Sequence, residues 1–284
     1  MLKKIFFAAA LLLASELGAK PVVIASIAPV EYLAKAVGGD KIEVQSLAKG
    51  DVHSYEPKPN DMKAVAKARI FIAAGLEFEE AWIPRFKASA KNLVVVKSDA
   101  KIAKLKEERG EQAEHDEKHE AHADPHVWLN PMLAITMARN ISDALIDMDK
   151  ANKDFYLKNF QKLMNDLLAF DESAKESLAG LKNRKFVVYH PAWGYFAAHY
   201  DLEQISIERS GKEPKIDEMA STLKMIKDEN IKVIFADPNR SQKSAQILAS
   251  QTGAKVELLD PLGYNLLENL KIAVGAIKDA NSPK

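Results

Sequence analysis

The feature that most constrains the fold is one long amphipathic segment, residues 150–181, near the middle of the chain. The segment contains neither glycine nor proline before Gly180. Its apolar residues recur at helical spacing, at Phe155, Leu157, Phe160, Leu163, Leu167 and Leu168. The pattern predicts a single helix. A helix of about 28 residues is roughly 42 Å long, so it would join two domains as a strut rather than as a loose linker.

Short apolar segments alternate with amphipathic ones on both sides of this helix. Before it, strands are expected at residues 22–26, 42–47, 69–73 and 93–96, with helices between them at 29–37, 60–68 and 81–90. After it, strands are expected at residues 186–189, 203–207, 232–236 and 255–259. This alternation is typical of parallel sheets covered by helices on both faces. The sequence therefore predicts an α/β protein with two parallel-sheet lobes, residues 20–149 and 182–284, joined by the single helix at 150–181.

The first 19 residues have the layout of a secretory signal peptide. Lys3 and Lys4 precede an apolar run, residues 5–13, and the segment ends on Gly18 and Ala19. We therefore expect export, with the mature chain beginning near Lys20. The apolar run is too short to cross a bilayer, and no later stretch reaches about 20 apolar residues, so no transmembrane helix is expected.

The composition narrows the location and the partners. The chain has no cysteine, which excludes disulfides, thiolate zinc ligands and a lipid attached to a signal cysteine. Its 40 basic residues balance its 40 acidic ones, so charge indicates neither nucleic acid nor an anionic membrane as a partner. A periplasmic protein without a lipid anchor fits these observations.

Three histidines and one aspartate occur where predicted strands or loops meet helices. His53 follows the strand at 42–47, His126 precedes a helix that begins at Pro131, His190 ends the strand at 186–189, and Asp260 closes the strand at 255–259. Open α/β sheets bind ligands at the carboxyl ends of their strands. Three neutral imidazoles and one carboxylate satisfy the four-coordinate geometry of zinc. The sequence therefore predicts a metal site.

Each of these residues also has a simpler interpretation. A single loop histidine is usually a surface or hydrogen-bonding residue, and an aspartate before a proline, as at Asp260, often caps a turn. Asp237 also ends a strand and is a rival carboxylate. His199 lies within a predicted helix, and we interpret it as structural.

The irregular segment 98–123 is dominated by charged residues and is expected to be mobile, because it cannot bury a core of its own. Within it, His115, His119 and His122 have helical spacing. They could take up metal weakly as an accessory loop, or they could be incidental histidines on a solvated charged segment.

Four separated motifs, at residues 51–57, 124–131, 189–196 and 259–263, closely resemble the ZnuA/TroA-like family of metal-binding solute receptors of ABC importers. The resemblance covers the whole mature length. It implies two α/β lobes bridged by a long helix, and a charged, histidine-bearing loop that marks zinc receptors. It also implies ligands at His53, His126, His190 and Asp260, and delivery of the ion to an inner-membrane permease. We expect a monomer.

The resemblance also bears on the identity of the metal. Manganese receptors of this family generally have a carboxylate where His190 stands, and imidazole favours zinc. Some zinc receptors of this kind have a glutamate at the position of Val52. Because that carboxylate is missing here, the fourth ligand is either Asp260 or water.

Other functions remain open at this stage. One is a manganese or iron receptor of the same family. Another is an exported zinc hydrolase, which would need an open coordination position and a general base such as Glu56 or Asp237. The chain has no H-E-x-x-H helix, and the resemblance points to a receptor, so we expect no enzymatic activity. A zinc buffer or surface adhesin would use the same site without an importer.

Overall fold

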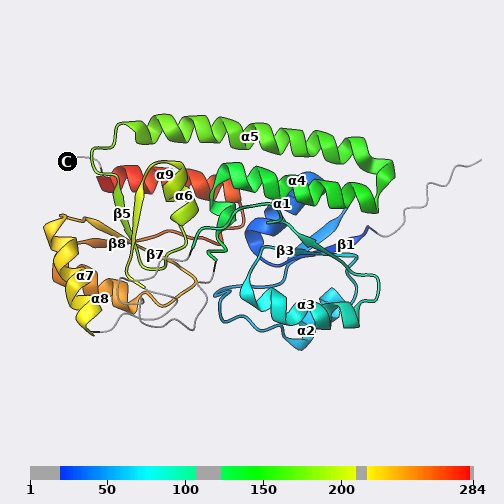
Figure 1. Ribbon diagram of the computed structural model, residues 1–284, viewed down its shortest axis with the longest axis horizontal. Coiled ribbons are helices and arrows are strands. Elements are labelled where there is room, and N and C mark those ends of the chain that lie inside the picture. The colour runs from blue at the N-terminus through cyan, green and yellow to red at the C-terminus, as the bar shows by residue number, and fades with distance from the viewer. Residues whose placement is uncertain (1–19, 107–122, 209–215, 282–284) are drawn as a thin grey trace, which may run out of the picture.

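The computed structural model describes residues 20–106, 123–208 and 216–281. Two α/β lobes lie beside each other beneath one long helix (Figure 1). The predicted signal peptide and the three histidines of the charged segment, His115, His119 and His122, lie outside the described residues. Within the described part of the chain, no helix is long and apolar enough to span a membrane.

The N-terminal lobe is built on a four-stranded parallel sheet with the order β2-β1-β3-β4. Its strands are β1 (Val22–Ala25), β2 (Glu43–Ser46), β3 (Ile70–Ala73) and β4 (Val94–Lys97). Its helices are α1 (Ala28–Gly38), α2 (Pro59–Val65), α3 (Glu77–Ser89) and α4 (Pro131–Met148). The central strands β1 and β3 are almost entirely buried, whereas the edge strands are partly exposed. Helices on both faces of the sheet account for this difference.

The C-terminal lobe repeats this topology with the order β6-β5-β7-β8. Its strands are β5 (Lys185–Val188), β6 (Glu203–Ser206), β7 (Val233–Ala236) and β8 (Lys255–Leu258). Its helices are α6 (Gly194–His199), α7 (Ile216–Asp228), α8 (Lys243–Thr252) and α9 (Leu266–Asn281). The prediction of two parallel-sheet lobes is confirmed.

The long connecting helix is α5 (Lys153–Ala179), and it runs along both lobes (Figure 1). It packs against α1 and α4 of the first lobe and against α9 of the second. The helix is shorter than the predicted segment 150–181 at both ends. A short 3-10 helix, η3 (Lys150–Asn152), precedes it, and Gly180 ends it. The prediction of a single helical strut is confirmed.

The two lobes share one continuous hydrophobic core. Leu33 of α1, Leu145 of α4, Leu167 of α5 and Leu270 of α9 belong to it, and all four are fully buried. Full burial of one leucine side chain contributes about 1.5–3 kcal/mol to the free energy of unfolding. Because separating the lobes would expose part of this core, wide hinge opening is disfavoured.

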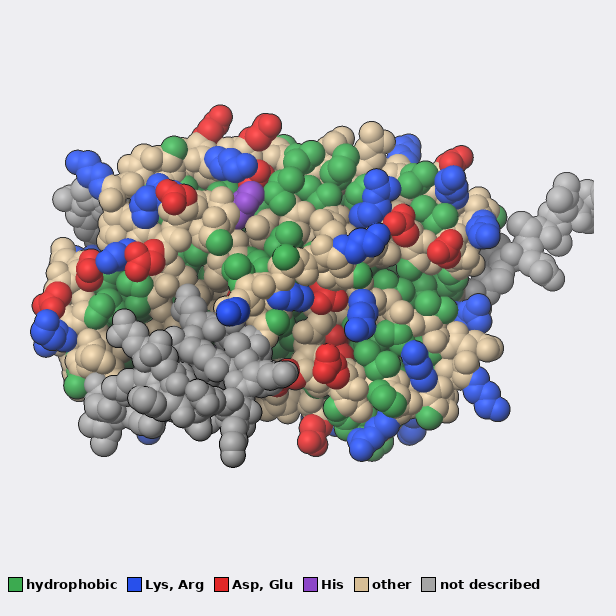
Figure 2. Space-filling model, in the orientation of Figure 1, with side chains coloured by type: hydrophobic (Ala, Val, Ile, Leu, Met, Phe, Trp, Pro, Cys, Tyr) green, Lys and Arg blue, Asp and Glu red, His purple; other side chains and the backbone are tan. Residues whose placement is uncertain are grey.

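The described ends of the charged segment 98–123 are attached to the N-terminal lobe. Ser98 is fully buried, and its hydroxyl donates to the Ala73 carbonyl at 2.6 Å. Lys106 and Ala123 form an isolated antiparallel bridge. The rest of the segment, which we expected to be mobile, lies outside the described residues. On the face shown in Figure 2, acidic and basic side chains are interspersed with hydrophobic ones.

Candidate metal centre

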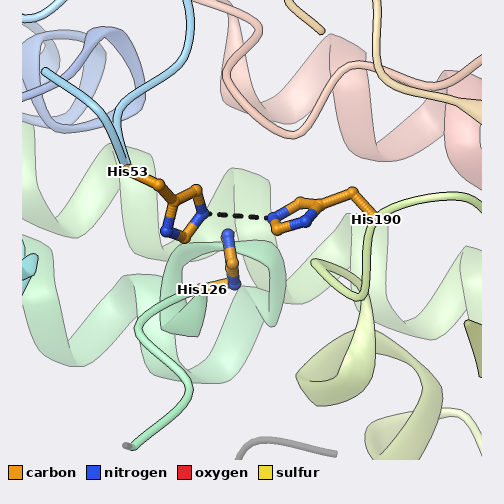
Figure 3. Close-up of side chains that lie close together, drawn as sticks. All are labelled: His53, His126 and His190. Atoms are coloured by element: carbon orange, nitrogen blue, oxygen red, sulfur yellow. Dashed lines mark hydrogen bonds between the residues drawn. The ribbon is translucent and has the colours of Figure 1, made fainter. Parts of the chain in front are cut away.

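Three histidines, two from the N-terminal lobe and one from the C-terminal lobe, point their rings toward one another (Figure 3). His53 lies on the loop that follows β2, His126 directly precedes the short 3-10 helix η2 (Val127–Leu129), and His190 follows β5. One nitrogen from each ring lies within 4.8 Å of the others. The structure thus brings together three of the four side chains that the sequence selected.

The spacing of the rings suits a small cation. The Nε2 atoms of His53 and His190 are 3.1 Å apart. A tetrahedral zinc site with Zn–N bonds of about 2.05 Å has its nitrogens roughly 3.3 Å apart. In the metal-free protein one of the two nitrogens donates its proton to the other, and a bound cation would take the place of that proton.

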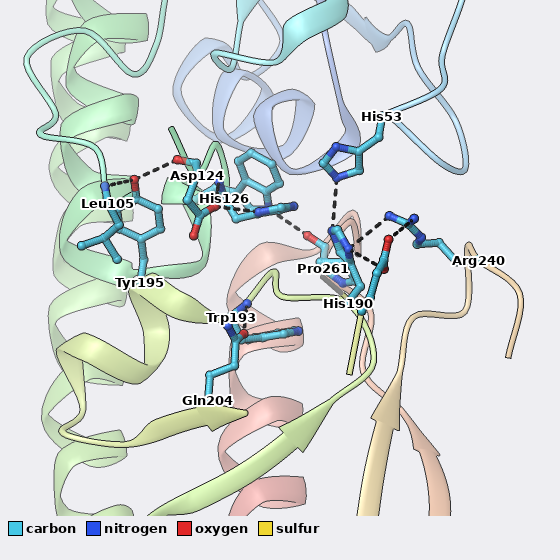
Figure 4. Close-up of polar contacts among 12 residues, drawn as sticks. His53, Leu105, Asp124, His126, His190, Trp193, Tyr195, Gln204, Arg240 and Pro261 are labelled. Atoms are coloured by element: carbon cyan, nitrogen blue, oxygen red, sulfur yellow. Dashed lines mark hydrogen bonds and ion pairs between the residues drawn. The ribbon is translucent and has the colours of Figure 1, made fainter. Parts of the chain in front are cut away.

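His126 is held by Asp124 (Figure 4). Both residues are buried, and Asp124 Oδ1 lies 2.9 Å from the His126 backbone nitrogen and 2.8 Å from its Nδ1. The Tyr195 hydroxyl donates to the Asp124 carbonyl at 2.9 Å and so connects this turn to the second lobe. A proton on Nδ1, shared with the carboxylate, leaves Nε2 free as a metal ligand.

His190 has a comparable carboxylate partner in Glu208. Its Nδ1 lies 3.1 Å from Glu208 Oε2 and 3.1 Å from Arg240 Nη1, and Arg240 Nη2 donates to Glu208 Oε1 at 2.7 Å. His190 and Glu208 are 6% and 2% exposed, so the guanidinium compensates the charge of a buried carboxylate. Backbone hydrogen bonding from Glu208 to the Tyr189 carbonyl, at 2.8 Å, fixes the two strand ends relative to each other.

His53 differs from the other two because it is exposed. Its backbone nitrogen donates to Asp51 Oδ1 at 3.1 Å, and the Ser54 hydroxyl donates to Asp51 Oδ2 at 3.1 Å. Further along the loop, the Tyr55 hydroxyl donates to Asp61 Oδ2 at 2.9 Å. Local turn contacts therefore shape the loop that presents this ring.

The surroundings of the rings favour their neutral forms. Although His53 is partly in contact with solvent, its ring lies against the other two, and this desolvation together with the nearby His126 and Arg240 lowers the pKa of His53 to about 4. Burial, followed by the neighbouring His126 and His53, lowers the pKa of His190 well below its usual 6.5. Both rings are therefore neutral near pH 7, as metal ligation requires.

Asp260, the predicted acidic ligand, lies outside the cluster of three rings. Among the described residues, the cluster holds the three histidines and no carboxylate. Asp260 Oδ1 instead accepts from Asn239 Nδ2 at 2.8 Å and from the Leu262 backbone nitrogen at 2.9 Å. The second contact is the turn-capping arrangement typical of an aspartate before a proline.

The rival carboxylate, Asp237, is also outside this cluster. Its Oδ1 accepts from the backbone and side-chain nitrogens of Asn239, at 2.7 and 3.0 Å. Burial is the main cause of a raised pKa for this carboxyl. His199 behaves as a structural residue: its Nε2 lies 2.6 Å from Asp171 Oδ1 on α5 and ties α6 to the long helix.

Three residues that support the rings were not predicted from the sequence: Asp124, Glu208 and Arg240. Asp124 is the first residue of the motif at 124–131, but no role was predicted for it. Glu208 and Arg240 follow β6 and β7, at the same sheet edge as His190. Applying the strand-end rule to every strand of the second lobe, rather than to its histidine and aspartates alone, would have selected both.

Two parallel-sheet lobes bridged by one helix, with three converging imidazoles between them, define a class of protein: a solute-binding receptor for a metal ion. The family described as zinc-uptake complex component A, periplasmic, matches residues 23–280. The chain belongs to this family, ZnuA.

Individual relatives agree with this assignment. The high-affinity zinc uptake system protein ZnuA of Bacillus subtilis (strain 168) is 30% identical over 284 residues, which cover 93% of this chain and 88% of that protein. A crystal structure of ZnuA matches with a TM-score of 0.86 and 34% identity, over 93% of this chain and 100% of that one. A zinc-bound deletion mutant of ZnuA has the same TM-score and identity, over 93% of this chain and 99% of its own.

Proposed function

We propose that this chain captures one Zn²⁺ ion in the periplasm with His53, His126 and His190, and delivers it to the permease of an ABC importer in the inner membrane. The observation that carries the proposal is the convergence of three imidazole nitrogens, from both lobes, within 4.8 Å of one another. A ligand set of imidazoles suits zinc better than manganese, which prefers carboxylates. The names of the zinc-uptake relatives support the same ion.

The fourth coordination position is taken, in this proposal, by water or by Asp260. The arrangement of Asp260 favours water, because its Oδ1 already accepts from Asn239 and from Leu262. To ligate the ion, Asp260 would have to give up one or both contacts or approach through its other oxygen.

Capture and release would involve modest movement. The shared core and α5 resist wide separation of the lobes. His53, on its exposed loop, can move away from the ion at lower cost than the two buried rings. We therefore propose a cycle of capture, small closure, docking on the permease, and release through displacement of this loop.

We propose a monomer that is exported by the signal peptide at residues 1–19, carries no lipid anchor and has no enzymatic activity. A hydrolase would need a general base beside the ion; Glu56 is an exposed loop residue, and Asp237 is engaged by Asn239. His115, His119 and His122 are proposed as a weak accessory metal-binding loop.

The test is titration of the metal-free protein with Zn²⁺ and with Mn²⁺, in parallel with His190→Ala and a matched control, His199→Ala. Tight zinc binding, weak manganese binding, loss of affinity in His190→Ala and retention in His199→Ala are expected. Tight manganese binding with weak zinc binding would overturn the metal, and unchanged affinity in His190→Ala would remove that ligand.

A growth assay tests the delivery step. A strain lacking this protein should grow poorly when zinc is chelated, and the intact chain should restore growth only when the permease is present. Restoration without the permease would favour a zinc buffer.

A further inference from the structure

Glu208 and Arg240 form a charge pair at the Nδ1 side of the His190 ring. Figure 4 labels His190 and Arg240. The Glu208 side chain is 2% exposed, and its Oε1 is 2.7 Å from Arg240 Nη2, whose side chain is 17% exposed. A buried carboxylate is costly unless a cation and hydrogen bonds compensate it. Arg240 therefore compensates the charge of the Glu208 carboxylate and holds its Oε1 atom.

The contacts at His190 Nδ1 assign a role to each member of the pair. This nitrogen is 3.1 Å from Glu208 Oε2 and 3.1 Å from Arg240 Nη1. One ring nitrogen either donates or accepts, so only one of the two contacts is a hydrogen bond at a time. The Nε2 atom faces the other rings and must offer its lone pair to an ion, which places the proton on Nδ1 and makes Glu208 its acceptor. Arg240 then acts on the ring through Glu208.

Arg240 also reaches the first lobe. Its Nη1 lies 3.9 Å from Asp51 Oδ1, the oxygen that accepts from the His53 backbone nitrogen. The pair is partly exposed and longer than a hydrogen bond, so its own contribution to stability is modest. The contact between Arg240 and Asp51 nevertheless connects the charge pair of Glu208 and Arg240 to the loop that carries His53.

We propose that Arg240 is a positioning residue of the metal site, which holds Glu208 against His190 and links this support to the His53 loop through Asp51. Arg240 slows release of the bound ion. The His190 ring is held through Glu208 and the His53 loop through Asp51, so movement of either away from the ion strains a contact to the same guanidinium. The inference rests on the proposed function, in which these histidines bind zinc.

The test compares Arg240→Gln with a control variant, Arg85→Gln. The control removes the same charge from α3, where the Arg85 guanidinium lies 4.5 Å from the centre of the Trp82 ring. Zinc-loaded protein is mixed with excess chelator to measure release, and metal-free protein with zinc to measure association. Arg240→Gln should release zinc about 10- to 100-fold faster, the range typical for lost partners of metal ligands, with association little changed. Arg240→Lys should restore part of the slow release, and Arg85→Gln should match the wild-type protein.

Two further measurements separate positioning from a general loss of structure. If Arg240 acts through Glu208, the double variant with Glu208→Gln should release zinc no faster than the faster single variant. Asp51→Asn leaves the pair of Glu208 and Arg240 intact, so it should remain folded and still release zinc several-fold faster. Melting temperatures of the metal-free proteins identify any variant that has unfolded.

A wild-type release rate in Arg240→Gln would overturn the inference. The proposed function would still stand in that case, provided that the wild-type chain binds zinc. Additive effects of Arg240→Gln and Glu208→Gln would also overturn the inference. If the wild-type chain does not bind zinc, both the function and this inference fail.

Discussion

The three histidines of the site fall into two unlike regions. His126 and His190 form a buried pair, each with a carboxylate at its Nδ1, Asp124 in one case and Glu208 in the other. His53 is exposed and is carried by a loop whose shape depends on local turn contacts. One part of the site is therefore preorganised, whereas the other part is able to close over the ion.

This division suits a protein that must both hold an ion and give it up. Preorganised ligands lose little conformational freedom on binding, so the buried pair should supply most of the affinity. A ligand on an exposed loop is drawn from the less stable part of the structure and can move without disturbing the core. We therefore assign affinity mainly to the buried pair and release mainly to the His53 loop.

The largest expected effect separates these two regions directly. His126→Ala should weaken zinc binding by more than about 100-fold, since even the loss of a ligand's supporting partner costs 10- to 100-fold. The loss of zinc affinity in His53→Ala should be at least ten times smaller than in His126→Ala, because His126 and His190 stay in place and water can occupy the vacated position. Competition with a chromophoric chelator measures both. Equal losses in the two variants would remove the distinction.

The next effect tests how the buried pair is held. Asp124→Asn removes the charge that shares a proton with His126 Nδ1, and zinc affinity should fall by about 10- to 100-fold. Asp143→Asn, on the exposed face of α4, is the matched control and should bind like the wild-type protein. Isothermal titration of both variants is sufficient. Wild-type affinity in Asp124→Asn would show that the carboxylate does not support the ring.

A smaller effect concerns pH. Three free imidazoles, with pKa values near 6.5, would lose about 1000-fold in zinc affinity for each pH unit below that value, because three protons compete with the ion. The pKa of His53 is lowered to about 4 and that of His190 lies well below 6.5, so just below pH 6.5 protons compete with zinc for these two rings less than they do for free imidazoles. The loss of zinc affinity should therefore be much shallower than 1000-fold per pH unit there, and it should steepen as pH falls toward 4.

Affinities measured at half-unit steps of pH test this window. A loss close to 1000-fold per unit between pH 6.5 and 5 would contradict the lowered pKa values.

The smallest effect is expected at Asp260. Asp260→Asn keeps an oxygen that can accept from Leu262, so the turn should persist, but it removes a charged candidate ligand. We expect zinc affinity to fall less than about tenfold, below the range seen for partners of metal ligands. The same titration measures it. A loss above 100-fold would make Asp260 the fourth ligand.

The sequence was sufficient to predict most of the fold. Apolar runs of strand length marked β1, β3, β5 and β7, which are the central strands of the two sheets, because burial on both faces leaves an unmistakable pattern. The ends of the helices were predicted less accurately. Helix α3 begins at Glu77, before the predicted residue 81, because Glu79 accepts from the backbone nitrogens of Ala74, Gly75 and Leu76. That cap lacks the serine or threonine that usually signals it.

The metal centre was predicted in part. The placement of His53, His126 and His190 near strand ends and loops could be predicted from the sequence, because the topology of a parallel sheet brings the carboxyl ends of its strands to one edge. Whether Asp260 points to the ion or caps its own turn depends on a side-chain rotamer, which no spacing encodes. Glu208 and Arg240 also follow strand ends, but arginine and glutamate are usually exposed, so the sequence did not show that the two pair beside a ligand.

X-ray absorption spectroscopy at the zinc edge, on the chain loaded with one equivalent of zinc, reports the ligands of the ion directly. We predict three imidazole nitrogens at about 2.0–2.1 Å and one oxygen ligand. His53→Ala should retain two imidazoles and gain an oxygen. A spectrum dominated by oxygen ligands, with one imidazole or none, would show that the three histidines do not bind the ion together.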